Sequence, residues 1–154
     1  MDKALLAACN ERMNTAEVVY MTTMREGYPC TRAMLNLRNR VQFPEHQHLY
    51  AAHDADLMTY VVTNTSSKKR KEIEADARVC LYFCNPSEFF GLSLAGDLEI
   101  VEDMEVKRAV WAESLAQYFP SGKPEDEDYT LLQLVPKQVS GWNRGQKFAF
   151  EVSS

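Results

Sequence analysis

The stretch TNTSSKKRKEIEADARVCLYF, residues 63–83, reads as the end of one strand, a short helix and a second strand. Hydroxyl side chains precede the helix, and four consecutive cations occupy residues 68–71. Cations are unfavourable at the start of a helix, because the positive end of the macrodipole lies there. The free N–H groups of a helix N-terminus bind anions, and a bound phosphate would make such cations favourable. The residues therefore suggest a phosphate site at this helix start.

The four cations also fit a second interpretation, in which they cover a solvated helix face. Lys68 is spaced to pair with Glu72, and Arg70 with Glu74, one helical turn apart. Ion pairs at this spacing stabilise a helix by about 0.2–0.5 kcal/mol. We assign Arg70 and Lys71 to this solvated face.

Lys69 differs from its neighbours because it shares a helix face with Ile73, four residues later. Ile73 is the apolar residue expected to anchor the helix, so Lys69 should lie at the edge of the packed side, beside the end of the preceding strand. The hydroxyls of Thr63, Ser66 and Ser67 would add donors at that point. From the residues alone, the phosphate site and the solvated face both remain open.

Composition limits the class of protein. The 154 residues suit one domain, residues 1–154, with 45% hydrophobic and 25% charged residues as in soluble globular proteins. The net charge of −5 argues against nucleic acid as a partner. There is no signal-peptide pattern and no apolar run of about 18 residues, so we expect no membrane span and a cytoplasmic location.

The cysteines and histidines give no catalytic or metal motif. Cys80 and Cys84 would lie about 13 Å apart on one strand, too far for a disulfide, so reduced thiols are expected. We interpret the cysteines as buried structural thiols, at positions 9, 30, 80 and 84. His46, His48 and His53 fall in a polar loop with no regular element to hold them as ligands, so no metal site is predicted.

The order of the expected elements argues against an alternating βαβ fold. Helices are expected at residues 3–13, 67–76 and 104–119, a long loop at 38–56, and strands at 17–24, 30–37, 57–63, 77–84, 89–101, 129–136 and 147–152. Because strands and helices do not alternate, a doubly wound parallel sheet is disfavoured. An antiparallel sheet that curls into a small barrel, with helices outside, fits better. The usual glycine-rich nucleotide motifs are missing as well.

The same stretch resembles the strand–helix–strand segment of the pyridoxamine 5′-phosphate oxidase superfamily. The likeness rests on Thr63, Ser67, Lys68, Lys69, Ile73, Arg78, Val79, Leu81 and Phe83. GYPCTRAM at residues 27–34 is similar to the family hairpin, and GLSLAGDLEIVEDMEVKRAVW and YTLLQLVPKQVSGWN are similar to its later segments. The short general-stress-protein branch is the most similar, although Ala77 stands where proline is usual.

This resemblance implies a six-stranded antiparallel split β-barrel with flanking helices, and a homodimer with flavin mononucleotide (FMN) at the subunit interface. It assigns the phosphate ligands to Arg32, Ser67, Lys68 and Lys69. It assigns the flavin-lining strand backbone to Ala33, Met34, Leu35, Val62 and Thr63. Trp142 is similar to an aromatic residue that approaches the flavin from the other subunit.

The function that the resemblance implies is that of an FMN-dependent oxidoreductase with a small-molecule electron donor or acceptor. The alternatives are a non-catalytic flavin-binding stress protein or sensor, and the same barrel with a deazaflavin or haem. Oxidation of pyridoxine phosphate itself is not expected, because Leu37 replaces the lysine of the true oxidases and WNRGQKFAFEV lacks their Arg-x-His element. The resemblance assigns no catalytic side chain.

Overall fold

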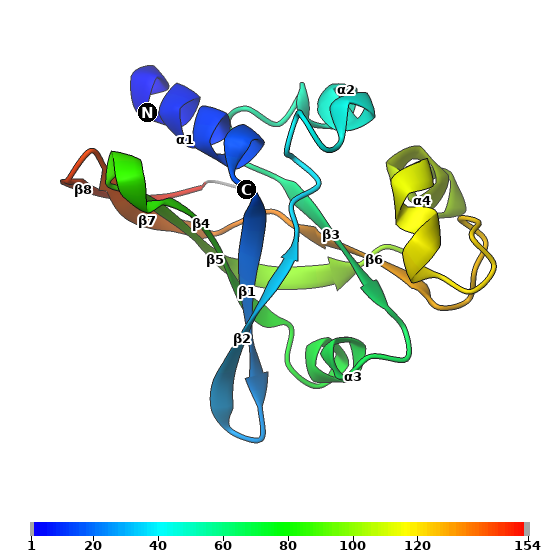
Figure 1. The fold of residues 1–154 in the computed structure, drawn as a ribbon. Coiled ribbons are helices and arrows are strands. Elements are labelled where there is room, and N and C mark those ends of the chain that lie inside the picture. The colour runs from blue at the N-terminus through cyan, green and yellow to red at the C-terminus, as the bar shows by residue number, and fades with distance from the viewer. Residues whose placement is uncertain (1, 153–154) are drawn as a thin grey trace.

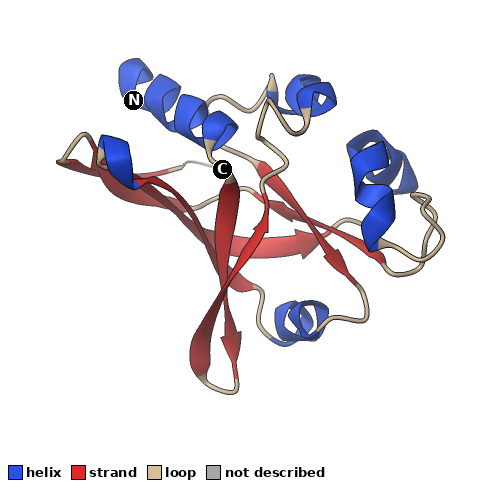
Figure 2. Cartoon of the chain, in the orientation of Figure 1, coloured by secondary structure: helices blue, strands red, loops and turns tan. Residues whose placement is uncertain are grey.

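The computed structural model describes residues 2–152, in which eight strands and four α-helices are joined by short 3₁₀ turns (Figures 1 and 2). The elements are α1 Lys3–Thr15, β1 Val18–Arg25, β2 Tyr28–Leu35, α2 Gln47–Tyr50, β3 Thr59–Asn64, α3 Lys68–Ala75, β4 Arg78–Asn85, β5 Phe90–Ile100, α4 Met104–Val110, β6 Tyr129–Leu134, β7 Gln138–Asn143 and β8 Gln146–Glu151. Within these residues no helix is long and apolar enough to cross a membrane.

All strand pairs are antiparallel, and six strands follow one another in the order β2-β1-β4-β5-β6-β3. The β7–β8 hairpin is attached to this path through β5. The sheet curls so that its two end strands, β2 and β3, approach each other without pairing (Figure 1). This is the predicted six-stranded split barrel, with the helices lying outside it (Figure 2).

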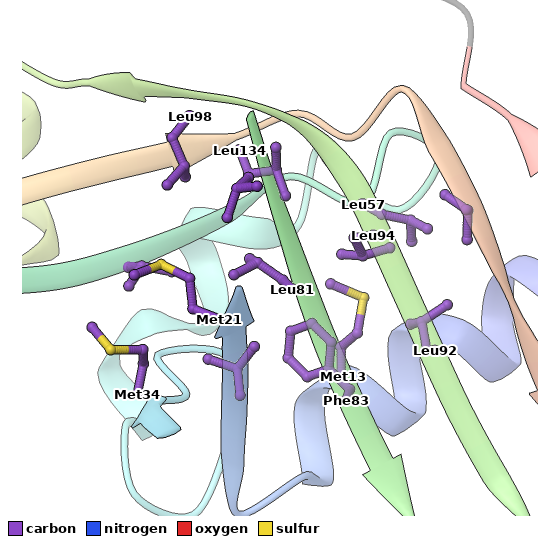
Figure 3. Packing of buried hydrophobic residues seen from close by; sticks show 14 of the residues in the cluster. Met13, Met21, Met34, Leu57, Leu81, Phe83, Leu92, Leu94, Leu98 and Leu134 are labelled. Atoms are coloured by element: carbon purple, nitrogen blue, oxygen red, sulfur yellow. The ribbon is translucent and has the colours of Figure 1, made fainter. Parts of the chain in front are cut away.

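The main hydrophobic core fills the inside of the curled sheet (Figure 3). Alternate residues of β4, namely Val79, Leu81 and Phe83, are buried, as period-two strand geometry requires. Met13 of α1 closes one end of this core, and Ile73 of α3 belongs to the same cluster. A smaller cluster, rich in aromatic residues, lies beneath α4 and the segment that follows it.

The long loop, residues 38–56, contains the short helix α2 and is anchored by a buried cation. Arg38 is 1% exposed and donates to the carbonyl of Met58 at 2.8 Å and to Oδ1 of Asn10 at 3.1 Å. Its guanidinium lies 4.6 Å from the ring centre of Tyr50, a cation–π contact. Burial lowers the pKa of Arg38 to about 10, so the side chain stays charged at neutral pH.

The prediction of a helix over residues 104–119 is wrong in its second half, because α4 ends at Val110. Asp103 caps it as expected, but Trp111 is extended and residues 113–118 form a separate 3₁₀ turn. The rings of Trp111 and Phe119 lie 5.6 Å apart and both contact Tyr129. Eight residues of continuous helix would separate those two residues by about 12 Å along the axis, so the aromatic cluster requires the break.

Strand β7 was not expected from the sequence. Its segment, QVSGWN, contains Gly141, and glycine weakens a strand pattern. A Cβ atom at this position would lie 2.0 Å from the carbonyl oxygen of Gly91 on β5. Glycine is therefore the residue that permits the close approach of β5 and β7.

Two hairpins close through two-residue turns in which both residues have positive φ. Glu26 and Gly27 join β1 to β2 with φ of 52° and 82°, and Arg144 and Gly145 join β7 to β8 with 51° and 83°. This is the requirement of a type I′ turn, whose first position favours asparagine. Glu26 and Arg144 therefore occupy a conformation that is unfavourable for their side chains.

We expect Glu26→Asn and Arg144→Asn each to stabilise the fold by about 0.5–1 kcal/mol, because asparagine tolerates the left-handed region. Urea unfolding of the two single variants and the double variant measures this. The two turns share no contact in the fold, so the effects should add. A double variant no more stable than the natural chain would show that the turns are not strained.

Candidate functional site

A cleft opens where the barrel is split, between the end strands β2 and β3. Its volume is about 170 Å³. It is lined by Ala33, Met34, Leu35, Val62, Thr63, Asn64, Lys69, Tyr118 and Phe119. The structure thus brings together six of the residues that the sequence analysis assigned to a cofactor site. Asn64, Tyr118 and Phe119 were not foreseen.

The walls of this cleft are sheet edges with unpaired backbone. Strand β2 pairs only with β1, and β3 only with β6, among the described residues. The outer sides of residues 33–35 and 62–64 therefore carry backbone N–H and C=O groups without a strand partner. Such groups need water or a ligand to satisfy them. A ligand with hydrogen-bond donors and acceptors at its rim could bond to these backbone groups.

The turn that leads from β3 into α3 is fixed by its own hydrogen bonds. The N–H of Thr65 donates to the carbonyl of Asp128 at 2.7 Å, that of Ser66 to Oδ1 of Asp128 at 2.8 Å, and that of Ser67 to the carbonyl of Asn64 at 3.0 Å. Ser67 is the N-cap residue of α3, but its side chain makes no capping bond. Its hydroxyl lies 3.2 Å from that of Thr63 instead. The helix therefore begins with its first-turn N–H groups uncapped.

The positions of the cations agree in part with the sequence analysis. Lys69 is half-buried and lines the cleft, on the same face as Ile73, which is 3% exposed. Lys68 and Lys71 are exposed. The predicted position of Lys69, at the edge of the packed side of α3, is therefore confirmed.

The assignment of Arg70 to a solvated face is wrong. Arg70 does pair with Glu74, at 2.6 Å, but it also donates to Oγ1 of Thr130 on β6 at 2.9 Å. Its side chain is 22% exposed. The partner lies 60 residues away in sequence, so helix spacing alone could not reveal it.

Arg32 is not among the residues that line the cleft, but it belongs to a hydrogen-bonded cluster with Thr23, Arg25 and Glu72. One terminal nitrogen, Nη1, donates to Oγ1 of Thr23 at 2.5 Å and to the carbonyl of Cys30 at 2.9 Å. The other, Nη2, donates to Oε2 of Glu72 at 2.5 Å. The Arg32 side chain is 17% exposed, and that of Glu72 9%.

Glu72 collects donors from two strands, which corrects its expected pairing with Lys68. Besides Arg32, it accepts from Nε of Arg25 at 2.5 Å and from the hydroxyl of Thr23 at 2.6 Å. Burial alone raises the pKa of Glu72, but these hydrogen bonds outweigh it and lower the pKa to about 2. The stability that Glu72 contributes is therefore present above the ordinary carboxylate pKa and is lost as pH falls towards 2.

Trp142 lies outside the cleft of its own chain. It projects from β7 on the outer face of the sheet, is 52% exposed and lines a separate hollow of about 600 Å³. Tyr82 lines the same hollow and pairs in register with Tyr20, and both tyrosines are also exposed. One chain therefore presents an aromatic outer face that is distinct from the cleft.

The histidines take structural positions. His46 is buried, stacks on Phe43 at 5.2 Å, and its pKa is lowered by burial. His48 is exposed, and His53 lies 3.0 Å from the carboxylate of Asp56. Residues 2–152 contain no group of three or more side chains that could hold a metal ion.

Comparison with known proteins agrees with the resemblance seen in the sequence. A solved protein from Clostridium acetobutylicum, described as related to general stress protein 26 of the pyridoxinephosphate oxidase family, is 27% identical, with a TM-score of 0.78, and the match covers 99% of this chain and 97% of that one. General stress protein 26 from Bacillus anthracis is 19% identical, with a TM-score of 0.70 and coverage of 95% and 98%.

A third solved structure, a heme binding protein from Mycobacterium smegmatis, shares the fold at 16% identity and a TM-score of 0.67, covering 98% of this chain and 58% of that one. The search of curated proteins returned no match. The family model described as "Pyridoxamine 5′-phosphate oxidase like" matches residues 30–154, which include the cleft, α3, Tyr82 and Trp142. The chain therefore belongs to the pyridoxamine 5′-phosphate oxidase-like family.

Proposed function

We propose that the cleft between β2 and β3 binds FMN and that the protein is a flavin-dependent oxidoreductase. One observation carries this proposal: two unpaired strand edges and a cation at an uncapped helix start meet in one cleft. Arg32, Ser67 and Lys69, with Lys68, would hold the phosphate. The backbone of residues 33–35 and 62–63 would hold the ring system. When bound, the flavin supplies hydride or single-electron transfer.

Arg32 has a donor to spare for a phosphate. A guanidinium carries five N–H groups, and the two terminal nitrogens of Arg32 donate to Met21, Thr23, Cys30 and Glu72. The Nε hydrogen of Arg32 has no acceptor among the described residues. The edge of a guanidinium that carries Nε can bind phosphate oxygens.

The cleft of a single chain is too small to enclose the whole cofactor. Its volume of about 170 Å³ compares with roughly 300–1,000 Å³ for ordinary ligand pockets. A second wall is needed, and the outer face with Tyr20, Tyr82 and Trp142 is exposed in the single chain. We therefore propose a symmetric homodimer in which Trp142 of one copy faces the flavin of the other.

Haem is the second candidate cofactor. Haem iron is held by histidine, cysteine, methionine or tyrosine. The cleft lining, all within residues 2–152, contains no histidine or cysteine, but it includes Met34, which is 9% exposed, and Tyr118, which is 48% exposed. The Mycobacterium smegmatis structure described as a heme binding protein gives this alternative a precedent in the fold. The absorption spectrum of the loaded protein separates a flavin, a deazaflavin and a haem.

The cleft offers few side chains for acid–base chemistry. Lys69 and Tyr118 are the titratable residues in its lining. The protein's part in the reaction would therefore be to bind and orient the flavin and to limit what approaches it. Consumption of a reduced nicotinamide by the loaded protein would support the oxidoreductase, whereas tight flavin binding without turnover would support a carrier or sensor.

The first prediction concerns the phosphate. FMN should bind with one molecule per chain, and riboflavin should bind at least about 100-fold more weakly, because it lacks the group that two or more charge-assisted hydrogen bonds would hold. Calorimetric titration with both ligands measures this. Equal affinities for FMN and riboflavin would show that the protein has no specific site for the phosphate.

A second prediction concerns the cations. Lys69→Ala should weaken FMN binding by roughly 10- to 150-fold, since one charge-assisted bond contributes about 1.5–3 kcal/mol. Arg32→Ala should cost at least as much. Lys71→Ala is the matched control, because Lys71 is exposed on the same helix. If Lys71→Ala weakened FMN binding as much as Lys69→Ala, the cations would act as a diffuse positive patch and not as a specific phosphate site.

A third prediction concerns assembly. The loaded protein should have a mass of about 35 kDa, twice the 17.6 kDa chain. Tyr82→Glu on the outer face should produce monomers, because it places two like charges in the proposed interface. It should also weaken FMN binding, although Tyr82 does not line its own chain's cleft. A monomer with FMN fully bound, seen by light scattering, would refute the dimer.

A further inference from the structure

We infer that Glu72 is a positioning residue, which orients Arg32 and thereby makes the cleft selective for a phosphorylated flavin over an unphosphorylated one. This inference rests on the proposed function and names a determinant of its specificity. Neither Glu72 nor Arg32 lines the cleft, but Arg32 directly precedes the lining residue Ala33, and Glu72 would act on a bound cofactor only through Arg32. It stands on α3 one turn after Lys69, so the same helix supplies both a ligand and the support for the other ligand.

The contacts of Glu72 fix the plane of the Arg32 guanidinium. Its Oε2 accepts from Nη2 of Arg32 and from the hydroxyl of Thr23, and that Thr23 oxygen in turn accepts from Nη1 of Arg32. The carbonyl of Cys30 holds Nη1 as well. With the carbonyl of Met21, which lies 3.3 Å from Nη1, four acceptors surround the terminal nitrogens and hold the guanidinium in one orientation. Nε is the nitrogen of Arg32 that has no acceptor within residues 2–152.

The second carboxylate oxygen of Glu72 binds a second arginine and so affects the net charge of the cluster. Oε1 of Glu72 accepts from Nε of Arg25, so one anion lies between two guanidiniums on neighbouring strands. Without that anion, Arg25 and Arg32 would repel each other in a half-buried place, and Arg32 would be free to swing away. The cluster keeps a net charge of +1, and Lys69 raises it to +2, which matches a phosphate dianion. Glu72 therefore cancels one of the two guanidinium charges and still leaves the cluster positive.

The experiment compares FMN and riboflavin affinities in a set of variants. In Glu72→Gln the amide keeps the shape but loses the charge, and we expect about tenfold weaker FMN binding with riboflavin affinity within about twofold. Glu72→Asp should recover part of the FMN affinity. Glu74→Gln is the matched control, because Glu74 lies on the same helix and pairs with Arg70. It should change neither affinity.

Arg25→Gln separates positioning from net charge. It removes a cation from the cluster but leaves the bonds from Thr23 and Arg32 to Glu72 in place. The ratio of FMN to riboflavin affinity should therefore stay close to that of the natural chain. The two variants change the net charge of the cluster in opposite directions, so net charge alone cannot weaken FMN binding in both. If Arg25→Gln lowers the ratio as much as Glu72→Gln does, the whole cluster and not Glu72 holds Arg32, and the specific positioning role of Glu72 is wrong.

A readout on the ligand-free protein makes the orientation itself observable. The Nε–H resonance of Arg32 in nitrogen-15 NMR spectra should be distinct in the natural chain and in Glu74→Gln, and should broaden or vanish in Glu72→Gln. A sharp, unshifted resonance in Glu72→Gln overturns the inference, as does tighter FMN binding, which would make Glu72 a competitor for Arg32. A natural chain that binds neither flavin overturns the proposed function and this role with it. FMN binding with an unchanged ratio in Glu72→Gln overturns the inference alone.

Discussion

The failure of β2 and β3 to pair is the constraint on which the rest of the structure depends. A closed barrel would satisfy every backbone group and leave no edge. Here the two end strands of a six-strand path face each other across a cleft instead. The core beneath them is complete, with Met34 of β2 and Val61 of β3 both buried in it. The opening therefore lies at the edges of the two strands and does not disrupt the core. The unpaired backbone groups along these edges are available to bind a ligand.

Helix α3 connects the two sides of this opening. It leaves β3 through a turn that Asp128 holds, and it packs against β1 beside β2. Lys69, Glu72 and Ile73 are spaced three and four residues apart, so they share one face of the helix. Ile73 enters the core, Lys69 lines the cleft, and Glu72 reaches across to Arg32 and Arg25. One helical face thus fixes the helix and places charge on both edges.

Local pattern predicted most of this and failed where partners are distant in sequence. The alternation of apolar and polar residues predicted most of the strands. The four-residue spacing between Lys69 and Ile73 predicted the position of Lys69, which lies beside the cleft. The pairing of Glu72 with Lys68 was expected because helix spacing shows only neighbours one turn away. The actual partners of Glu72 lie 40 and 47 residues earlier, and Arg70 similarly finds Thr130 on β6. The broken helix after Val110 has the same origin, because Tyr129 draws Trp111 and Phe119 together from another strand.

Two features of the single chain bear on the proposed dimer. The cleft has edges but a small volume, and the outer sheet face carries aromatic side chains that are exposed. An exposed aromatic face of this kind commonly marks an interface. Under two-fold symmetry each copy would offer its face to the other and receive the same in return. In such a dimer the aromatic face of one copy would form the second wall of the other copy's cleft. Cofactor binding and dimer stability should therefore depend on each other.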